Sequence, residues 1–333
     1  MKKVVLACVA LVGTLLSVSA IAEEIGRKFE TFIMPTENAL PSRIVVDGDV
    51  AIWVLETNAN KLARFDLQGE GTTEFDIPTY RSFPSDIALD GSGNLWFTEQ
   101  DANQLGLFNP ATGAFKEFDI PTIDSVPRRI ITDEKGFVWF TQFEGNHIAK
   151  FDPRTETFTE YPIPTTGSQP IGITVGPKGA IWFIEAHGNK LGMFDPESET
   201  FKEFPFPDPF LVPKDVIFDR DGVVWFGGRR SKKLMMFDPK NEKFEGFPLP
   251  VNGVVEGLTL DKAGNVLFSL GHVGRLGAMN IASKEFLVLK VVLGNSEPGD
   301  IAVDGEGNIW LADLSQNALI KVYGAQLGDL WVK

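Results

Sequence analysis

The sequence predicts an all-β protein, a seven-bladed β-propeller built from four-stranded blades. Three observations predict it: a regular tryptophan repeat, recurrent turn sequences inside each copy, and a strand-like N-terminal segment that matches the end of a copy. A module of this size cannot bury its apolar faces alone, so similar modules stack side by side and close into a ring.

Tryptophan sets the register of the repeat. The column reads Trp53, Trp96, Trp139, Trp182, Trp225, Leu267 and Trp310, at intervals of 42 or 43 residues. A proline opens six of the copies, at Pro41, Pro84, Pro127, Pro170, Pro213 and Pro298, and Val255 replaces it in the remaining copy. Because these large rings are regular from copy to copy, we expect them to form the core between blades rather than a ligand site.

Turn sequences divide each copy into four short β-type runs. Asp-x-x-Gly recurs, beginning at Asp90, Asp133, Asp219, Asp261 and Asp304, and Asn/Asp-Pro recurs at Asn109, Asp152, Asp195 and Asp238. Glycine supplies a positive φ and proline presets φ, so both favour hairpins. Four strands in one copy of about 40–45 residues are typical of a propeller blade, and no amphipathic helical stretch competes with them.

The N-terminal segment is expected to close the ring. Residues 29–36 match the fourth-strand segment 115–122, yet they precede the first full copy. The last copy, from Pro298 to about Tyr323, has only three good strands. Residues 28–34 would therefore supply the outer strand of the final blade, which removes an unpaired sheet edge.

The first 22 residues are typical of a signal peptide. Lys2 and Lys3 precede the apolar run 4–16, and Ala20-Ile21-Ala22 forms a cleavage sequence. The run is too short for a stable membrane span, and no cysteine stands at the cleavage point, so we expect no membrane anchor. Residues 23–333 are expected to form a single domain, a monomer that is periplasmic or secreted.

Composition excludes several function classes. Cys8, the only cysteine, lies in the signal segment, so the mature chain has no disulfide and no thiol nucleophile. The formal net charge of −14 becomes −16 once Lys2 and Lys3 are removed. Such a protein repels nucleic acid and anionic lipid head groups, which favours a small molecule, a cation or a neutral polymer as partner. The expected ligand is a small molecule or cyclic peptide at the central channel.

Propeller topology places candidate site residues around the channel, where the second strand ends and the next blade begins. The column two residues after the proline reads Arg43, Asp86, Arg129, Gly172, Asp215, Gly257 and Asp300. The column three past the tryptophan reads Glu56, Glu99, Gln142, Glu185, Gly228, Leu270 and Asp313. The column five past it reads Asn58, Asp101, Glu144, His187, Arg230, His272 and Ser315. These columns are polar and vary between copies, as expected of residues that face a ligand or water.

Glu185 and His187 are the most suggestive pair in these columns. Residues two apart on an extended strand point the same way. At the mouth of an acidic channel, a carboxylate beside an imidazole can bind a divalent metal or carry out base chemistry. His147, outside the columns, is expected on the surface or between blades.

The segment 181–192, Ile-Trp-Phe-Ile-Glu-Ala-His-Gly-Asn-Lys-Leu-Gly, resembles the virginiamycin B (streptogramin B) lyase family, whose members open a cyclic depsipeptide by elimination. Segments 95–99 and 139–141 resemble that family's blade signature. The resemblance implies that His187 removes a proton α to the ester carbonyl. It also implies that Mg²⁺, held by Glu185 and Glu203, stabilises the resulting charge. Glu144, Arg230 and His272, from the same loop column as His187, are the candidate substrate-binding residues.

Several departures from the family pattern leave other functions open. Glutamate also occupies the equivalent position in other copies, at Glu74, Glu117 and Glu160. Glu203 can therefore be a structural residue of the repeat instead of a metal ligand. The resemblance implies a second histidine on a neighbouring blade, where this chain has Glu144. The alternatives to a Mg²⁺-dependent carbon–oxygen lyase are a non-catalytic ligand-binding propeller and a metal-dependent lactonase, and the blade count disfavours the lactonase.

Overall fold

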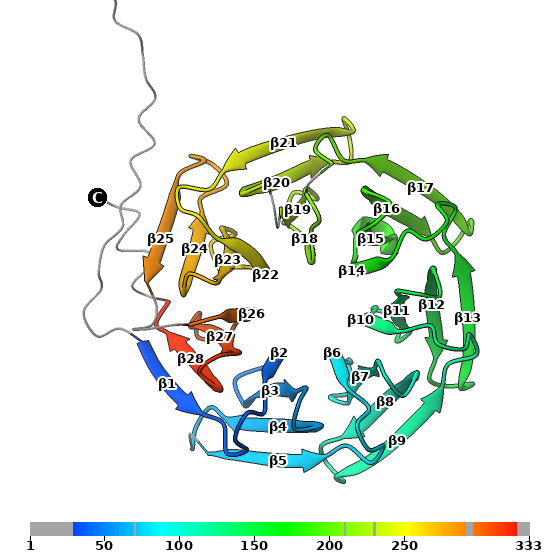
Figure 1. Ribbon diagram of the computed structural model, residues 1–333, viewed down its shortest axis with the longest axis vertical. Helices are drawn as coiled ribbons and strands as arrows, with labels where there is room; N and C mark the ends of the chain where they lie inside the picture. Colours follow the sequence, from blue (N-terminus) through cyan, green and yellow to red (C-terminus); the bar gives the residue numbers. More distant parts are fainter. Residues whose placement is uncertain (1–28, 70, 210, 229–230, 291–295, 325–333) are drawn as a thin grey trace, which may run out of the picture.

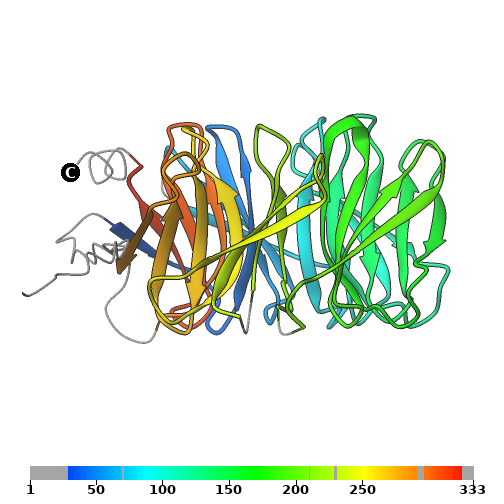
Figure 2. The ribbon, with the colours of Figure 1, turned by 90° about the horizontal axis from the view of Figure 1, so that it is seen from above.

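The computed structural model describes residues 29–69, 71–209, 211–228, 231–290 and 296–324. The expected signal peptide, residues 1–22, and Arg230 lie outside these ranges. The described chain forms seven four-stranded antiparallel sheets, set as blades around a central axis (Figure 1). Seen from the side, the molecule is a disc whose strands run between two faces (Figure 2). The predicted all-β, seven-bladed architecture is confirmed.

Within each of the first six blades, the strands follow chain order from the axis outward. Blade 1 contains β2 (Pro41–Asp47), β3 (Ala51–Glu56), β4 (Lys61–Asp66) and β5 (Thr72–Asp76). Blade 2 contains β6 (Pro84–Leu89), β7 (Leu95–Glu99), β8 (Gln104–Asn109) and β9 (Ala114–Asp119). Blade 3 contains β10 (Pro127–Thr132), β11 (Val138–Gln142), β12 (His147–Asp152) and β13 (Thr157–Pro162). Blade 4 contains β14 (Pro170–Val175), the 3₁₀ turn η1 (Pro177–Gly179), β15 (Ile181–Glu185), β16 (Lys190–Asp195) and β17 (Thr200–Pro205).

The remaining three blades complete the ring. Blade 5 contains β18 (Val216–Phe218), β19 (Val224–Gly227), β20 (Lys233–Asp238) and β21 (Lys243–Pro248). Blade 6 contains β22 (Val254–Leu260), β23 (Val266–Gly271), β24 (Arg275–Met279) and β25 (Phe286–Lys290). Blade 7 contains β26 (Pro298–Val303), β27 (Ile309–Asp313), β28 (Ala318–Val322) and, as its outer strand, β1 (Phe29–Ile33). In the described part of the chain, no helix is long and apolar enough to cross a membrane.

The N-terminal strand closes the ring as predicted. β1 pairs antiparallel with β28, with Phe29 opposite Val322 and Ile33 opposite Ala318. The first strand of the described chain therefore belongs to the last blade, and the two ends of the propeller are joined by backbone hydrogen bonds. This pairing covers the edge that β28 would otherwise expose.

The tryptophan column forms the core between blades, as expected. Each of its rings is buried, and Trp139 of blade 3 lies 6.0 Å, centroid to centroid, from Phe194 of blade 4. The same contact crosses the closure, where Phe65 of blade 1 lies 5.3 Å from Trp310 of blade 7. Burying one such side chain stabilises the fold by about 2–3 kcal/mol, so the blades are held together mainly by these aromatic layers.

The Asp-x-x-Gly turns anchor the tryptophans as well as reversing the chain. In blade 3, Asp133 accepts hydrogen bonds at Oδ1 from the N–H groups of Lys135 and Phe137. Its Oδ2 accepts the Nε1–H of Trp139 at 2.8 Å. Equivalent bonds join Asp90 to Trp96, Asp219 to Trp225 and Asp304 to Trp310. One carboxylate thus satisfies both the turn and the buried indole.

Candidate functional site

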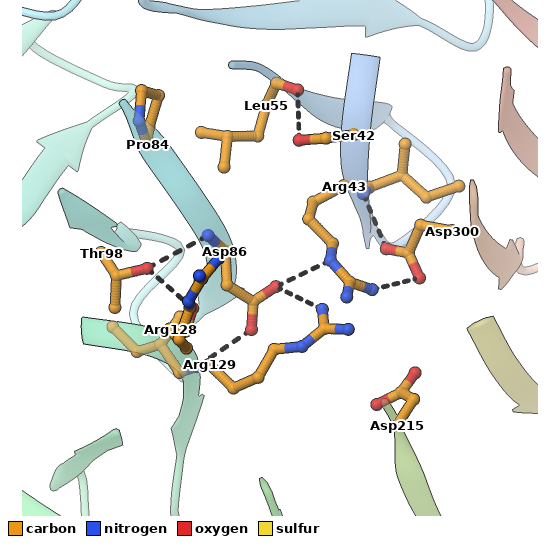
Figure 3. Close-up of polar contacts among 12 residues, drawn as sticks. Ser42, Arg43, Leu55, Pro84, Asp86, Thr98, Arg128, Arg129, Asp215 and Asp300 are labelled. Atoms are coloured by element: carbon orange, nitrogen blue, oxygen red, sulfur yellow. Dashed lines mark hydrogen bonds and ion pairs between the residues drawn. The ribbon is translucent and has the colours of Figure 1, made fainter. Parts of the chain in front are cut away.

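The innermost strands share an irregularity that aims side chains into the channel. In β2, β6 and β10 the pairing register shifts just after the opening proline. A β-bulge of this kind adds a residue to one strand and changes the direction of the neighbouring side chains. It brings the column two residues past the proline to the axis, where Arg43, Asp86, Arg129, Asp215 and Asp300 lie (Figure 3).

Two aspartates of this column also tie the inner strand of one blade to that of the next. Asp86 of blade 2 accepts the N–H of Ile130 in blade 3 at 2.9 Å. Asp300 of blade 7 accepts the N–H of Ile44 in blade 1 at 3.0 Å. These bonds satisfy backbone donors that the bulges leave without a ladder partner.

Two arginines lie between the carboxylates of this ring (Figure 3). Arg43 Nη1 is 3.0 Å from Asp300 Oδ1, and Arg43 Nε is 3.6 Å from Asp86 Oδ1. Arg129 Nη1 is 3.5 Å from the same Asp86 oxygen. Burial raises the pKa of Asp86 to about 7, although the positive charge of Arg43 opposes that rise. Burial likewise raises the pKa values of Asp215 and Asp300.

A cavity of about 470 Å³ opens over this ring on the face where inner strands begin and second strands end. We call it the mouth cavity. It is lined by Ser42, Arg43, Ser85, Arg128, Arg129, Phe143, Gln169, Ile171, Ala186, His187, Val212, Lys214, Glu256, Gly299 and Leu314. Its charged lining is mainly basic, whereas Asp86, Asp215 and Asp300 of the ring beneath are not part of that lining. Asp86 and Asp300 each bond the backbone of a neighbouring blade through one oxygen and an arginine through the other.

His187 lies in this cavity, in the loop that follows β15. Its imidazole is exposed, and its backbone N–H donates to the carbonyl oxygen of Ser168 at 2.9 Å. That bond fixes the loop against the link from blade 3, while the side chain is left to face a ligand. The structure therefore brings His187 together with Arg43, Arg128 and Arg129 around one space.

Glu185 and Glu203 lie together, in a cluster between blades 3 and 4. The Glu185 side chain is fully buried, and neither carboxylate oxygen has a hydrogen-bond partner among the described residues. Burial, with the nearby charge of Glu203, raises its pKa to about 7. Glu203 accepts the N–H and hydroxyl of Thr165 and the ammonium of Lys190, the last at 2.6 Å. Burial acts to raise the pKa of Glu203, but these bonds outweigh it and the pKa is lowered.

The same cluster recurs in other blades. In blade 1, Glu74 accepts hydrogen bonds from the N–H and hydroxyl of Thr36 and from the ammonium of Lys61. Burial raises the pKa of the neighbouring Glu56 to about 8. In blade 2, Glu117 accepts the N–H and hydroxyl of Thr79. In blade 3, Gln142 donates to Glu160 at 2.5 Å, and its amide oxygen lies 2.8 Å from Nδ1 of His147, which is half-buried. The column three past the tryptophan is therefore buried framework, and the expectation that it faces a ligand or water is wrong.

This framework does not fit the Mg²⁺ site that the family resemblance implied. Lys190 already places a positive charge on Glu203, and an identical glutamate pair with its own lysine stands in blade 1. Within the described ranges, no group of three or more His, Cys, Asp or Glu side chains has the arrangement of a metal site. We therefore assign no metal-dependent step to Glu185 and Glu203.

The candidate substrate-binding residues are not gathered in one place. Glu144 is exposed, and its carboxylate accepts Gln169 Nε2 at 3.3 Å beside the mouth cavity. His272 is exposed, its Nδ1 lies 3.0 Å from Glu297, and it is not part of the cavity wall. Arg230 lies outside the described residues.

Sequence reasoning missed the column that lines the mouth cavity most completely. The residue directly after each opening proline, or after Val255, reads Ser42, Ser85, Arg128, Ile171, Lys214, Glu256 and Gly299, and all seven line the cavity. This column varies between blades as strongly as the columns two past the proline and three and five past the tryptophan. That variation is the sequence signal that would have identified it. Phe143, Ala186 and Leu314 form a second such column, four past the tryptophan.

Comparison with known proteins agrees with this geometry. The model of the virginiamycin B lyase family matches residues 13–279. The chain belongs to the virginiamycin B lyase family. Virginiamycin B lyase from Staphylococcus aureus is 26% identical, with a TM-score of 0.83, over 89% of this chain and 99% of that one. A catalytically inactive variant of the S. aureus enzyme, solved with quinupristin, is 25% identical over the same shares, also at 0.83.

More distant matches show the propeller fold alone. The extracellular domain of a one-component system from Bacteroides thetaiotaomicron is 16% identical, with a TM-score of 0.71, over 89% of this chain and 40% of that one. A search of the curated proteins found no match. Membership of the virginiamycin B lyase family thus agrees with the observed fold, while the site and its chemistry must be argued from this chain's residues.

Proposed function

We propose that the protein binds a small molecule in the mouth cavity and opens a cyclic ester there by elimination, with His187 as the general base. The observation that carries the proposal is the position of His187, whose exposed imidazole shares one cavity with three arginine side chains. Family membership supports the reaction class, because S. aureus virginiamycin B lyase shares 26% of the sequence over nearly its whole length.

In this reaction His187 takes a proton from the carbon α to a carbonyl group. The electron pair left behind forms a double bond to the β carbon, whose C–O bond breaks. The ester leaves as a carboxylate, and the ring opens without addition of water. Negative charge develops on oxygen in both steps, and the guanidinium groups of Arg128 and Arg129 supply fixed positive charge in the same cavity.

The test is incubation of the purified protein with quinupristin, followed by mass spectrometry. Elimination gives a linear product of unchanged mass that takes up no oxygen from labelled water, whereas hydrolysis adds the mass of one water. His187→Ala should abolish the product, and His272→Ala, an exposed histidine outside the cavity wall, should retain it. Absence of a product at stoichiometric enzyme would exclude this lyase reaction.

The second candidate is a ligand-binding propeller without catalysis. The observation that favours it is the inter-blade framework of Glu185, Lys190 and Glu203, since these glutamates hold a lysine rather than a reaction centre. It uses the same mouth cavity, and a stability shift with a ligand but no product would support it. No observation favours the lactonase alternative.

Export is part of the proposal and depends on residues 1–22. The cleavage sequence Ala20-Ile21-Ala22 predicts a mature chain that begins at Glu23, in the periplasm or outside the cell. N-terminal sequencing of the protein recovered from cell fractions tests this directly. A full-length chain retained in the cytoplasm would contradict it.

A further inference from the structure

Arg128 and Arg129 are adjacent in the chain, yet both line the mouth cavity. Consecutive residues of a regular strand point to opposite faces. Here the register of β10 shifts between Pro127 and Ile130, so both residues lie in a bulge. The bulge is what allows two neighbouring guanidinium groups to face one space.

The Arg128 guanidinium has a donor that the described protein does not satisfy. The Nε of Arg128 is buried and has no hydrogen-bond partner among the described residues. In that part of the chain no carboxylate lies within ion-pair distance of Arg128, and Asp101 and Glu144 act on it only from farther away. Burial, against those two charges, lowers the pKa of Arg128. A buried donor without an acceptor calls for a ligand or another explanation.

Arg129 is held by an ion pair with Asp86. Arg129 is 8% exposed, and its Nη1 lies 3.5 Å from Asp86 Oδ1. The same Asp86 oxygen also pairs with Arg43. The guanidinium of Arg128 lies 4.9 Å from the centre of the Phe143 ring, which holds it in place. Two guanidinium groups held beside one cavity, one of them with an unpaired N–H donor, favour a planar anion with two acceptor oxygens.

We propose that Arg128 and Arg129 bind the carboxylate of an organic ligand whose body lies on the apolar part of the cavity wall. That wall contains Phe143, Ile171, Val212 and Leu314. The inference rests on the proposed use of the mouth cavity and deepens it. An elimination in this cavity releases a carboxylate from the ester, and the arginine pair accepts it. A carboxylate-bearing ligand also suits the second candidate, in which no reaction occurs.

The experiment compares N-acetyl-L-phenylalanine with N-acetyl-L-phenylalaninamide, which has the same body without the charge, by isothermal titration calorimetry on the full mature chain. The acid is expected to bind about tenfold or more tightly than the amide, since a paired carboxylate adds charge-assisted hydrogen bonds. Arg128→Gln should remove most of that preference, and Arg128→Lys should restore only part of it. Arg128→Gln should leave the fold intact, because Nε has no partner to lose.

The matched control is Arg154→Gln. Arg154 pairs with Asp152 in the turn between β12 and β13, on the face opposite the mouth cavity, and it is largely exposed. This variant should bind like the wild type. Equal binding of acid and amide, no binding of either, or full preference in Arg128→Gln would overturn the inference. Quinupristin turnover is scored separately, so a protein that opens quinupristin without preferring the acid keeps the proposed function and loses this site.

Discussion

Arg43 of the first blade donates a hydrogen bond from Nη1 to Oδ1 of Asp300 in the last blade, with 3.0 Å between the two atoms. The other oxygen of Asp300 accepts the N–H of Ile44. The junction between the last and first blades is therefore held at the channel by a charged pair, while β1 closes the outer edge of blade 7. Arg43 also faces Asp86, so its removal would leave two carboxylates in the channel without their main counter-charge.

Replacement of Arg43 by leucine is expected to lower the free energy of unfolding by about 3 kcal/mol, because a largely buried pair loses one partner. Arg64→Leu is the matched control, since Arg64 pairs with Asp66 at 3.2 Å near the surface. That control should cost no more than about 1 kcal/mol. Urea unfolding of the two variants measures the difference, and equal small losses would show that the channel pair adds nothing.

Glu185→Gln is expected to change how stability depends on pH. Burial and Glu203 raise the pKa of Glu185 to about 7 in the folded protein, above its ordinary value of 4.5. The stability contributed by the protonated side chain is therefore complete below about pH 4.5 and is lost as pH rises through 7. Glutamine cannot lose a proton, so the variant should gain on the wild type by roughly 2 kcal/mol between pH 5 and pH 8.

Blade 3 supplies the precedent for that variant, because Gln142 already occupies the equivalent position and donates to Glu160. Unfolding measured at both pH values tests the sign. Glu203→Gln should instead be less stable than the wild type by an amount that stays nearly constant from pH 5 to pH 8 and shrinks only as pH falls below about 4.5, because the pKa of Glu203 is lowered and its charge is bound by Lys190. A constant difference between Glu185→Gln and the wild type at all pH values would contradict the assignment.

Addition of Mg²⁺ is expected to leave the melting temperature unchanged. Lys190 already neutralises Glu203, one of the two glutamates that would bind the ion. Any turnover of quinupristin should likewise survive chelation by EDTA. A rise in melting temperature with Mg²⁺ that disappears in Glu185→Gln would show that this framework does hold a metal.

Removal of residues 1–33, which include β1, is expected to destabilise the last blade and promote association. β28 would then expose an unpaired edge between Ala318 and Val322. Removal of residues 1–22 alone is the control and should leave stability unchanged. Size-exclusion chromatography and thermal unfolding report both effects, and an equally stable, monomeric 34–333 chain would contradict the closure.

The fold was predictable from sequence because each blade must bury the same aromatic residue and reverse the chain in the same way. Trp139 and its turn residue Asp133 repeat for that reason, although the hydrogen bond between them was not foreseen. Predicting the site required more than regular strand geometry. The β-bulge after each opening proline decides which side chains reach the channel, and it brought Arg128 to the cavity where alternation would have turned it away.

The expectation that side chains alternate along the strand also gave Glu185 the wrong position. Two residues on one face of a strand were expected to share the mouth, but β15 ends at Glu185 and the chain then turns into a loop. Glu185 consequently stays between blades, whereas His187 reaches the cavity. The lysine that pairs with Glu203 comes from the next strand, so its role was visible only once β15, β16 and β17 were paired.

Nuclear magnetic resonance of the histidine side chains tests the central claim most directly, because the chain has only three histidines. During titration with N-acetyl-L-phenylalanine, the account predicts that the imidazole signals of His187 move, while those of His147 and His272, which are not part of the cavity wall, stay in place. Movement of His147 or His272 with a stationary His187 would show that the ligand binds elsewhere on the propeller.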